Sequence, residues 1–312
     1  MENPARVKNF RTVGLGLEIA PYFNPALPRH KYNVHYTDYI SNDEILAKAA
    51  ENPGALNKEI PTIDYVWKPG RPLKETSPEG LLYDFAIASH VMEHVPNTVG
   101  WLNDILAVLK VGAVLRLVLP NAERSNDHFR ARTSVAQLVA NWLDNPSVPT
   151  PFQVFDFMAD CLDDDGNNTF DENGVSIYTR RHYSLADALS TAQFVHNERQ
   201  YIDVHCTVWT ADTFKEAFDQ IVSLGLMNVK VEIQETAMWE FTVDLIKLGE
   251  PSVFPPQDLR ISETTQTDLA HARMAFHECA ALLRAKEEQY NALAASRHSR
   301  VLGAVRRLLG RL

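Results

Sequence analysis

The chain has 312 residues, of which 45% are hydrophobic and 22% charged, and its formal net charge at pH 7 is -10. This composition is typical of a globular protein with one large domain and an appendage, or with two domains, and the negative charge disfavours nonspecific binding to nucleic acid. The three widely spaced cysteines, without a C-x-x-C pair, do not predict a disulfide framework or a zinc ribbon. Because no run of about 18 apolar residues occurs and MENPARVKNFRTVG lacks an apolar signal-peptide stretch, we expect a cytoplasmic protein without a transmembrane helix.

The first part of the chain alternates strand patterns with helix patterns. We predict strands at 13–20, 33–38, 63–67, 83–89 and 113–120, and helices at 42–51 and 98–110. Ser41 or Asn42 caps the first helix, and three prolines leave room for one helical turn at most between the first two strands. The nearly all-apolar run YDFAIAS is typical of a central parallel strand. The alternation therefore predicts a parallel sheet with right-handed crossovers.

Residues 121–200 interrupt this rhythm. Helix-like runs at 134–144, 152–162 and 184–198, together with a polar loop, predict a helical insertion over one end of the sheet. A helix at 211–224 follows, and then two strands at 227–234 and 239–247, which a short turn joins. A short turn makes the last two strands antiparallel. The predicted fold class is therefore α/β, Rossmann-like, with a mostly parallel sheet whose last strand is antiparallel.

The C-terminal part has a different pattern. A Pro-rich linker spans 251–261, and 262–312 reads as helix. Apolar residues at alternating spacings of three and four form a heptad seam, which predicts a coiled-coil-like helix and self-association through 266–295. Residues 296–312 hold five arginines and no acid, with apolar residues on the opposite face. This segment fits either a helix lying on an anionic membrane surface, hence a peripheral protein at the inner membrane face, or an ordinary exposed helix or dimer seam.

Four short motifs follow the predicted strands in order. They are LEIAP (17–21), Asp38, Asp64-Tyr65 and SHVMEHV (89–95). In an open α/β sheet, ligands bind at the carboxyl ends of the strands, so we expect the four motifs to meet there. An acid that ends the second strand, as Asp38 does, accepts hydrogen bonds from the ribose hydroxyls of a nucleoside.

The ordered set resembles the class I S-adenosylmethionine (SAM)-dependent methyltransferases. The resemblance rests on LEIAPYFNP (17–25), SHVMEH (89–94) and WLNDILAVLKVGA (101–113), and it covers about residues 13–250. It is strongest to a branch with an LEIGP-type first motif, many of whose members look like bacterial polysaccharide or surface-glycan enzymes. The resemblance implies a methyltransferase domain over 1–250, SAM as cofactor, and O-methylation of a saccharide or surface-glycan intermediate.

The resemblance also assigns roles to individual residues. Glu18 and the following loop would hold the amino-acid part of SAM, Asp38 the ribose, and Asp64 with Tyr65 the adenine. The remaining implied cofactor contacts are in the loop after the first strand and in the motif after the fourth: Ala20, Pro21, Tyr22, Asn24, Ser89, His90, Glu93 and His94. Ala20 stands where the family has its first glycine, and the later glycines of the motif are absent.

Methyl transfer to a hydroxyl requires alignment of the acceptor and a base. Histidines beside charged residues occur at Asp127-His128 with Arg130, at Arg181-His182, and at Asp203 with His205. A histidine is suited to accept a proton at neutral pH. His128 and His205 are therefore the first candidates for the catalytic base.

Three other interpretations remain beside this one. H-x-x-E-H at 90–94 matches a zinc-peptidase pattern, but that chemistry needs a helix and Pro96 follows, so we predict no metal site; the Glu93-His94 pair also fits a role in pinning its loop. A glycosyltransferase would need a D-x-D motif, and the acidic run 163–165 lies in a polar loop. A non-catalytic methyltransferase-like protein, which scaffolds a glycan-assembly complex through its tail, would account for the lost glycines.

Overall fold

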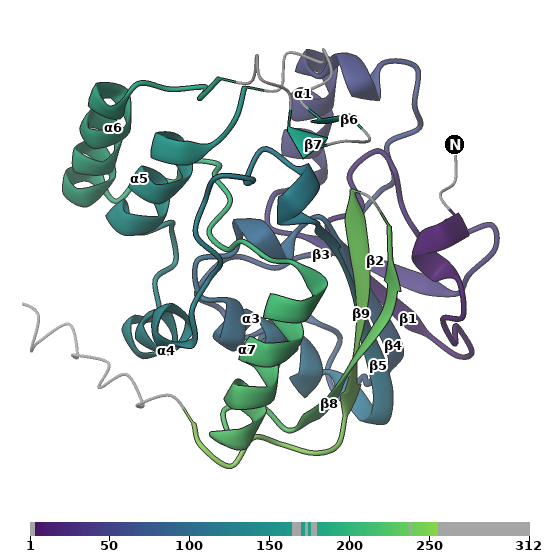
Figure 1. The fold of residues 1–312 in the computed structure, drawn as a ribbon. Helices are drawn as coiled ribbons and strands as arrows, with labels where there is room; N and C mark the ends of the chain where they lie inside the picture. Colours follow the sequence, from purple (N-terminus) through teal and green to yellow (C-terminus); the bar gives the residue numbers. More distant parts are fainter. Residues whose placement is uncertain (1–3, 164–169, 172–173, 176–179, 238, 255–312) are drawn as a thin grey trace, which may run out of the picture. The chain divides into compact units, whose positions relative to one another are not determined.

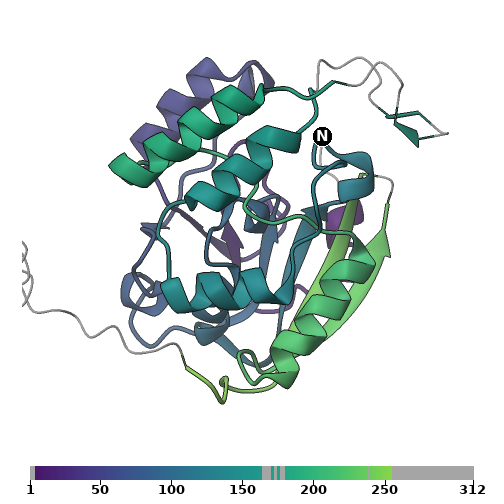
Figure 2. The same ribbon diagram turned by 60° about the vertical axis from the view of Figure 1, so that its left-hand side comes forward.

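The sheet is the frame on which the molecule is built. The computed structural model describes residues 4–163, 170–171, 174–175, 180–237 and 239–254 (Figures 1 and 2). In these residues seven strands form one sheet in the order β3-β2-β1-β4-β5-β9-β8. The strands are β1 (Gly16–Ile19), β2 (Val34–Asp38), β3 (Tyr65–Val66), β4 (Tyr83–Ser89), β5 (Leu109–Pro120), β8 (Val229–Thr236) and β9 (Glu240–Lys247).

The strand directions confirm the predicted fold class. β1 pairs in parallel with β2 and β4, and the parallel pairing continues to β3 on one side and β5 on the other. β9 is antiparallel to both β5 and β8. The chain order reverses between β1 and β4, which makes the carboxyl ends of these strands a topological switch point, where Rossmann-like sheets bind ligands.

α1 (Asn42–Glu51) packs on one face of the sheet, and α3 (Thr98–Ala107) and α7 (Ala211–Ser223) pack on the other. The remaining helices are α2 (Leu73–Thr76), α4 (Val135–Asp144), α5 (Pro151–Asp160) and α6 (Leu185–Glu198). Successive residues of β4 enter different cores: Phe85 and Ile87 pack with Ile45 of α1, whereas Ala86 and Ala88 pack on the face that α3 and α7 cover. This explains the continuous apolar sequence of β4, because both of its faces are buried.

Several element boundaries differ from the sequence prediction. β1 begins at Gly16 rather than at residue 13, and Gly16 lies against the Phe85 ring, where a Cβ would stand 2.2 Å from Phe85 Cε2. The helix predicted for 98–110 ends at Ala107, because Leu109 already pairs with Tyr83. The residues between the predicted helix and the predicted strand at 113 instead belong to β5, which has an irregularity where Gly112 has a φ of +82°.

The predicted insertion between β5 and α7 contains α4, α5, α6 and a short hairpin of β6 (Phe170–Asp171) and β7 (Gly174–Val175). α5 and α6 pack side by side around their own apolar cluster (Figure 2). Gln153 Nε2 donates a hydrogen bond to the carbonyl of Pro96 at 3.0 Å, and Asn97 Nδ2 donates to Asn145 Oδ1 at 2.7 Å. The insertion therefore contacts the loop that follows β4.

The C-terminal predictions are not addressed by the structure. The linker beyond residue 254 and the predicted helix 262–312 lie outside the described residues, and so do the self-association segment 266–295 and the arginine-rich segment 296–312. Within the part of the chain that is described, each helix is too short or too polar to cross a membrane.

Candidate active site

The carboxyl ends of the first four strands open into one cavity of about 950 Å³. Ala20 follows β1, Asp38 ends β2, Trp67 follows β3 and His90 follows β4, and all four line the cavity. The insertion contributes further walls, with Trp142, Asn145, Tyr201 and Asp203. Three of the four motifs singled out in the sequence therefore contribute residues to the cavity, and Trp67, just beyond the third motif, contributes as well. The volume is at the upper end of the usual range for small-molecule sites.

The loop after β1 keeps a glycine-like turn without a glycine. Ala20 has a φ of +51° and Tyr22 a φ of +45°, and both side chains line the cavity. The amide of Ala20 donates to the carbonyl of Thr37 at 2.7 Å, which ties the turn to β2. A non-glycine residue in this left-handed region costs roughly 1–2 kcal/mol. The backbone course that the missing glycine would favour is thus retained.

Glu18 holds this loop through two hydrogen bonds from backbone amides. Its carboxylate is 2% exposed and accepts the amides of Ala26 at 2.7 Å and Leu27 at 2.9 Å. Burial raises the pKa of Glu18 to about 7, although the two amides favour the charged form. Pro21 and Asn24 lie in the loop that Glu18 anchors, and the Asn24 amide donates to the Pro21 carbonyl at 3.1 Å. These three residues shape the loop but do not line the cavity.

Asp38 faces the cavity directly. It is 5% exposed, and its Oδ1 accepts the amide of Ile40 at 3.3 Å. Burial raises the pKa of Asp38. This is the position at which an acid can accept hydrogen bonds from ribose hydroxyls.

The residues expected to hold an adenine are placed differently. Asp64 accepts the Tyr36 amide at 2.6 Å and pairs with Arg29, while the Tyr65 hydroxyl lies 2.9 Å from the Tyr83 hydroxyl. Neither lines the cavity, because β3 ends at Val66 and the residue beyond it takes this position. That residue is Trp67, which stacks on Trp101 with ring centroids 6.0 Å apart.

His90 follows β4 in a left-handed conformation, with a φ of +55°. Its Nε2 lies 2.8 Å from Glu240 Oε2 and its Nδ1 lies 3.4 Å from Glu93 Oε1. Burial lowers the pKa of His90, but the two carboxylates outweigh burial and raise it to about 9. His90 is therefore a charged residue of the cavity wall at neutral pH. The preceding Ser89 does not line the cavity.

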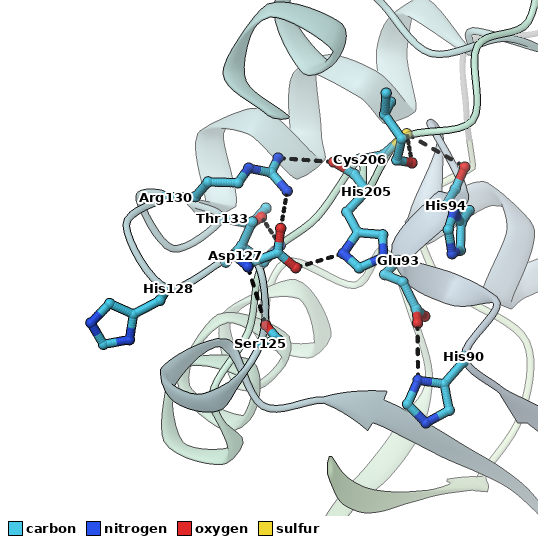
Figure 3. Close-up of polar contacts among 12 residues, drawn as sticks. His90, Glu93, His94, Ser125, Asp127, His128, Arg130, Thr133, His205 and Cys206 are labelled. Atoms are coloured by element: carbon cyan, nitrogen blue, oxygen red, sulfur yellow. Dashed lines mark hydrogen bonds and ion pairs between the residues drawn. The ribbon is translucent and has the colours of Figure 1, made fainter. Parts of the chain in front are cut away.

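A polar cluster adjoins this wall (Figure 3). Glu93 and Asp127 are buried in it, whereas His94, His205 and Asp203 are partly exposed. The rings of His94 and His205 meet edge to face with centroids 4.7 Å apart, and His94 Nδ1 lies 2.9 Å from Asp203 Oδ1. His205 Nδ1 bonds to Asp127 Oδ2. Of these residues His94 and Asp203 line the cavity, whereas Glu93, Asp127 and His205 stand behind them.

The two histidines expected to act as bases differ in position. His205 lies in the cluster, one ring behind His94, as described above. His128 Nδ1 is 2.9 Å from the Glu123 carbonyl and its ring points away from the cluster (Figure 3). The neighbouring Asp127 turns inward to His205, so His128 turns outward. Arg181 and His182 pair with Asp160 and Asp163 and also lie outside the cavity wall.

Several residues that line the cavity were not predicted from the sequence. Trp67 lies just past the motif that was recognised, and Trp142 is buried where α4 meets the cavity. Asp104 lies on α3, where burial, with Glu75 as a further cause, raises its pKa to about 7. Its helix carried only an apolar pattern in the sequence, and no motif marked the acid on its cavity side.

No family model matches the chain, and no curated protein matches it. Among solved structures, the chain is similar to a protein described in work on the conversion of a disulfide bond into a thioacetal group during echinomycin biosynthesis. The two chains are 12% identical, the match covers 80% of this chain and 83% of that chain, and the TM-score is 0.39.

A methyltransferase from Pyrococcus furiosus matches with 11% identity over 78% of this chain and 80% of that chain, at a TM-score of 0.35. A S-adenosylmethionine-dependent methyltransferase from Clostridium acetobutylicum matches with 8% identity over 79% and 89%, at a TM-score of 0.37. At such identities and TM-scores the likeness decides neither activity nor substrate.

Proposed function

We propose that this chain is a SAM-dependent methyltransferase. The observation that carries the proposal is the position of Asp38: a desolvated carboxylate that ends β2 and faces a cavity at the switch point of a Rossmann-like sheet, with Ala20 and Trp67 in the same wall. A nucleoside bound there would find an acceptor for its ribose hydroxyls in Asp38. It would find aromatic faces in Trp67 and Trp101.

The wall fits SAM better than a dinucleotide. SAM carries a sulfonium and an adenosine but no phosphate, and a sulfonium is attracted to aromatic faces and carboxylates. A dinucleotide requires a glycine-rich turn at the carboxyl end of β1. Gly14 and Gly16 instead lie at the amino end of β1, where Gly14 makes room for the Asp84 side chain. Gly14 and Gly16 thus allow close packing between β1 and β4.

We propose further that the acceptor is a hydroxyl of a saccharide or surface-glycan intermediate. The cavity is large enough for a cofactor and a second small molecule, and its insertion side carries hydrogen-bonding side chains in Asn145, Tyr201 and Asp203. Polar groups of this kind suit a hydroxyl-rich acceptor. The methyl group of SAM supplies the electrophile, and the walls of the cavity align the acceptor oxygen with it and exclude water.

Cofactor binding is the first test. Calorimetric titration with S-adenosylhomocysteine should give a one-to-one complex, and Asp38→Asn should weaken it by about 10- to 100-fold, because a charge-assisted hydrogen bond contributes about 1.5–3 kcal/mol. Asp43→Asn, which changes an exposed acid on α1, is the matched control and should bind like the original chain. Absence of binding at millimolar ligand would contradict the proposal.

Transfer is the second test. Incubation with methyl-labelled SAM and an extracted glycan fraction should place the label on the glycan. Binding of S-adenosylhomocysteine without transfer to any saccharide acceptor would instead support the non-catalytic scaffold.

We also propose that the C-terminal segment places the enzyme at the cytoplasmic face of a membrane. The five arginines and apolar face of 296–312 support binding to anionic lipid, and the heptad pattern of 266–295 supports self-association. In co-sedimentation with anionic liposomes, the full chain should bind and residues 1–295 should stay in solution. Equal binding by both would contradict the membrane role, and a monomer in sedimentation equilibrium would contradict self-association.

A further inference from the structure

Three side chains that the proposed methyl transfer does not yet use meet at the edge of the cavity. Glu93 and His94 come from the short turn η3 (Met92–His94) after β4, and His205 comes from the segment between α6 and α7. One ligand atom from each lies within 4.8 Å of the others (Figure 3). Two imidazoles and a carboxylate are the ligand set that transition metals such as Mn²⁺, Fe²⁺, Co²⁺ and Zn²⁺ use in proteins.

His205 is oriented as metal-binding histidines are. His94 Nδ1 lies 2.9 Å from Asp203 Oδ1, and His205 Nδ1 bonds to Asp127 Oδ2. A metal-binding histidine almost always presents its other ring N–H to a carboxylate or carbonyl, which fixes the tautomer and leaves a lone pair for the ion. With its Nδ1 engaged in this way, His205 keeps the lone pair of Nε2 for an ion, whereas His94 Nδ1, 2.9 Å from Asp203 Oδ1, makes no hydrogen bond within the described residues.

The carboxylate supplies an independent observation. Glu93 is 1% exposed, and its Oε2 is buried without a hydrogen-bond partner among the residues that the structure describes. A buried charged oxygen without a donor is costly, and native proteins rarely leave one unless a ligand or ion uses it. Glu18 shows the usual solution, because both of its oxygens accept amides.

The outer layer of the cluster is already held in place. Arg130 Nη1 donates to Asp127 Oδ1 at 2.6 Å, and Arg130 Nη2 donates to Asp156 Oδ2 at 2.7 Å and to the His205 carbonyl at 2.8 Å. Asp127, Arg130 and the backbone of His205 thus form one rigid unit. Such support keeps a ligand histidine in a single orientation before the ion arrives.

We propose that Glu93, His94 and His205 bind one divalent transition-metal ion at the edge of the cavity. His94 lines the cavity, so an ion held there can reach a bound molecule. The matched acceptor is a saccharide with two neighbouring oxygens that can both bind the ion. In this arrangement His205 is a metal ligand and not the proton acceptor that its sequence context predicted.

The role of the ion, though not its binding, rests on the proposed methyl transfer. A bound cation lowers the pKa of a hydroxyl that coordinates it, so that the proton is released to water. The acceptor oxygen then forms a bond to the methyl carbon of SAM as the carbon–sulfur bond breaks and its electron pair stays on sulfur. The products are the methyl ether, S-adenosylhomocysteine and the released proton.

The decisive experiment is a titration of chelator-treated protein with Co²⁺. The original chain should bind one equivalent, seen by calorimetry and by the visible absorption bands of protein-bound cobalt, and Zn²⁺ should displace it. Failure of the original chain to bind one equivalent below millimolar Co²⁺ overturns the proposal, and this outcome does not depend on the folding of any variant.

Variants locate the site. Glu93→Gln and His205→Asn should each weaken Co²⁺ binding by about 100-fold or more, and Asp127→Asn, in a positioning residue, by about 10-fold with a changed cobalt spectrum. His196→Asn, in an exposed histidine of α6, is the matched control and should bind normally. Normal Co²⁺ binding by folded Glu93→Gln overturns the proposal.

Binding of S-adenosylhomocysteine separates the two proposals. A chain that binds Co²⁺ but not S-adenosylhomocysteine keeps the metal site and loses the methyltransferase function. One that binds S-adenosylhomocysteine but not Co²⁺ loses only the metal site.

Discussion

Two groups of charged and polar side chains in this molecule differ in how their hydrogen bonds are satisfied. Arg116 of β5 donates from Nε and Nη2 to the two oxygens of Asp244 on β9, at 2.7 and 2.8 Å, and from Nη1 to the Lys8 carbonyl. The cluster of Glu93, His94 and His205 lies at the carboxyl edge of the same sheet and leaves Glu93 Oε2 without a donor in the described residues. The first group is closed and holds strands together, whereas the second stays open toward a ligand.

The largest effect should come from opening the closed pair. Asp244→Asn leaves the fully buried Arg116 guanidinium without its counter-charge, and the free energy of unfolding should fall by about 3–5 kcal/mol in urea denaturation. The double variant Arg116→Met/Asp244→Leu should recover much of this loss, because two packed apolar side chains replace the pair. A loss below 1 kcal/mol from the single change would show that the pair does not hold β5 and β9 together.

Glu18 is a buried carboxylate whose two oxygens both accept hydrogen bonds, and its effect on stability should depend on pH. Its pKa of about 7 in the folded chain exceeds the ordinary 4.5, so the folded state binds the proton more tightly than the unfolded state. Its contribution to stability is thus fully present below about pH 4.5 and is lost as pH rises through 7, by about 3 kcal/mol. The difference in unfolding free energy between the original chain and Glu18→Gln should change by this amount; a difference independent of pH would contradict it.

Substitution of Glu93 should lower the free energy of unfolding less than substitution of Asp244. Without metal, Glu93→Gln should cost about 1–2 kcal/mol, less than Asp244→Asn, because it loses the 3.4 Å contact of Oε1 with His90 Nδ1 while Oε2 has no donor to lose within the described structure. With Co²⁺ at about 100 times its dissociation constant, the original chain should gain about 2.7 kcal/mol and the variant nothing. Thermal and urea unfolding with and without Co²⁺ measure the cost of the substitution and the stabilisation by the ion. If the ion stabilises the variant as much as the original chain, Glu93 does not bind it.

The smallest effect concerns the strained loop at the cavity. Ala20→Gly should raise the free energy of unfolding by about 0.5–1 kcal/mol, because glycine adopts the φ of +51° without strain. Ala47→Gly, on the exposed face of α1, is the matched control and should lower it by about 1 kcal/mol. If both changes destabilise the chain equally, the left-handed turn at Ala20 stores no strain.

The fold could be predicted because its patterns are local. The run YDFAIAS became β4, and the predicted cap Ser41 forms a capping box with Glu44 at α1. The start of the fifth strand was misplaced because pairing of Leu109 with Tyr83 across the sheet, which no local pattern reveals, extends β5 through Gly112.

The site was predicted at the level of segments rather than side chains. Parallel strands share a carboxyl edge, so Ala20, Asp38 and His90 were placed correctly at one cavity. Trp67, and not Asp64 or Tyr65, lines the cavity, because β3 ends at Val66 and no local pattern fixes that end. The meeting of His205 with Glu93 required two segments far apart in the sequence to fold together, and the motif 90–94 alone could not show it.

The stacked indoles of Trp67 and Trp101 also give the protein an optical signal of its own. Of the five tryptophans in the chain, these two and Trp142 border the cavity. A planar base that contacts an indole face alters its fluorescence, so an unlabelled solution of the protein can report occupancy as a change in emission. Trp67→Phe and Trp101→Phe, compared one at a time, would then show which side of the stack the bound molecule touches.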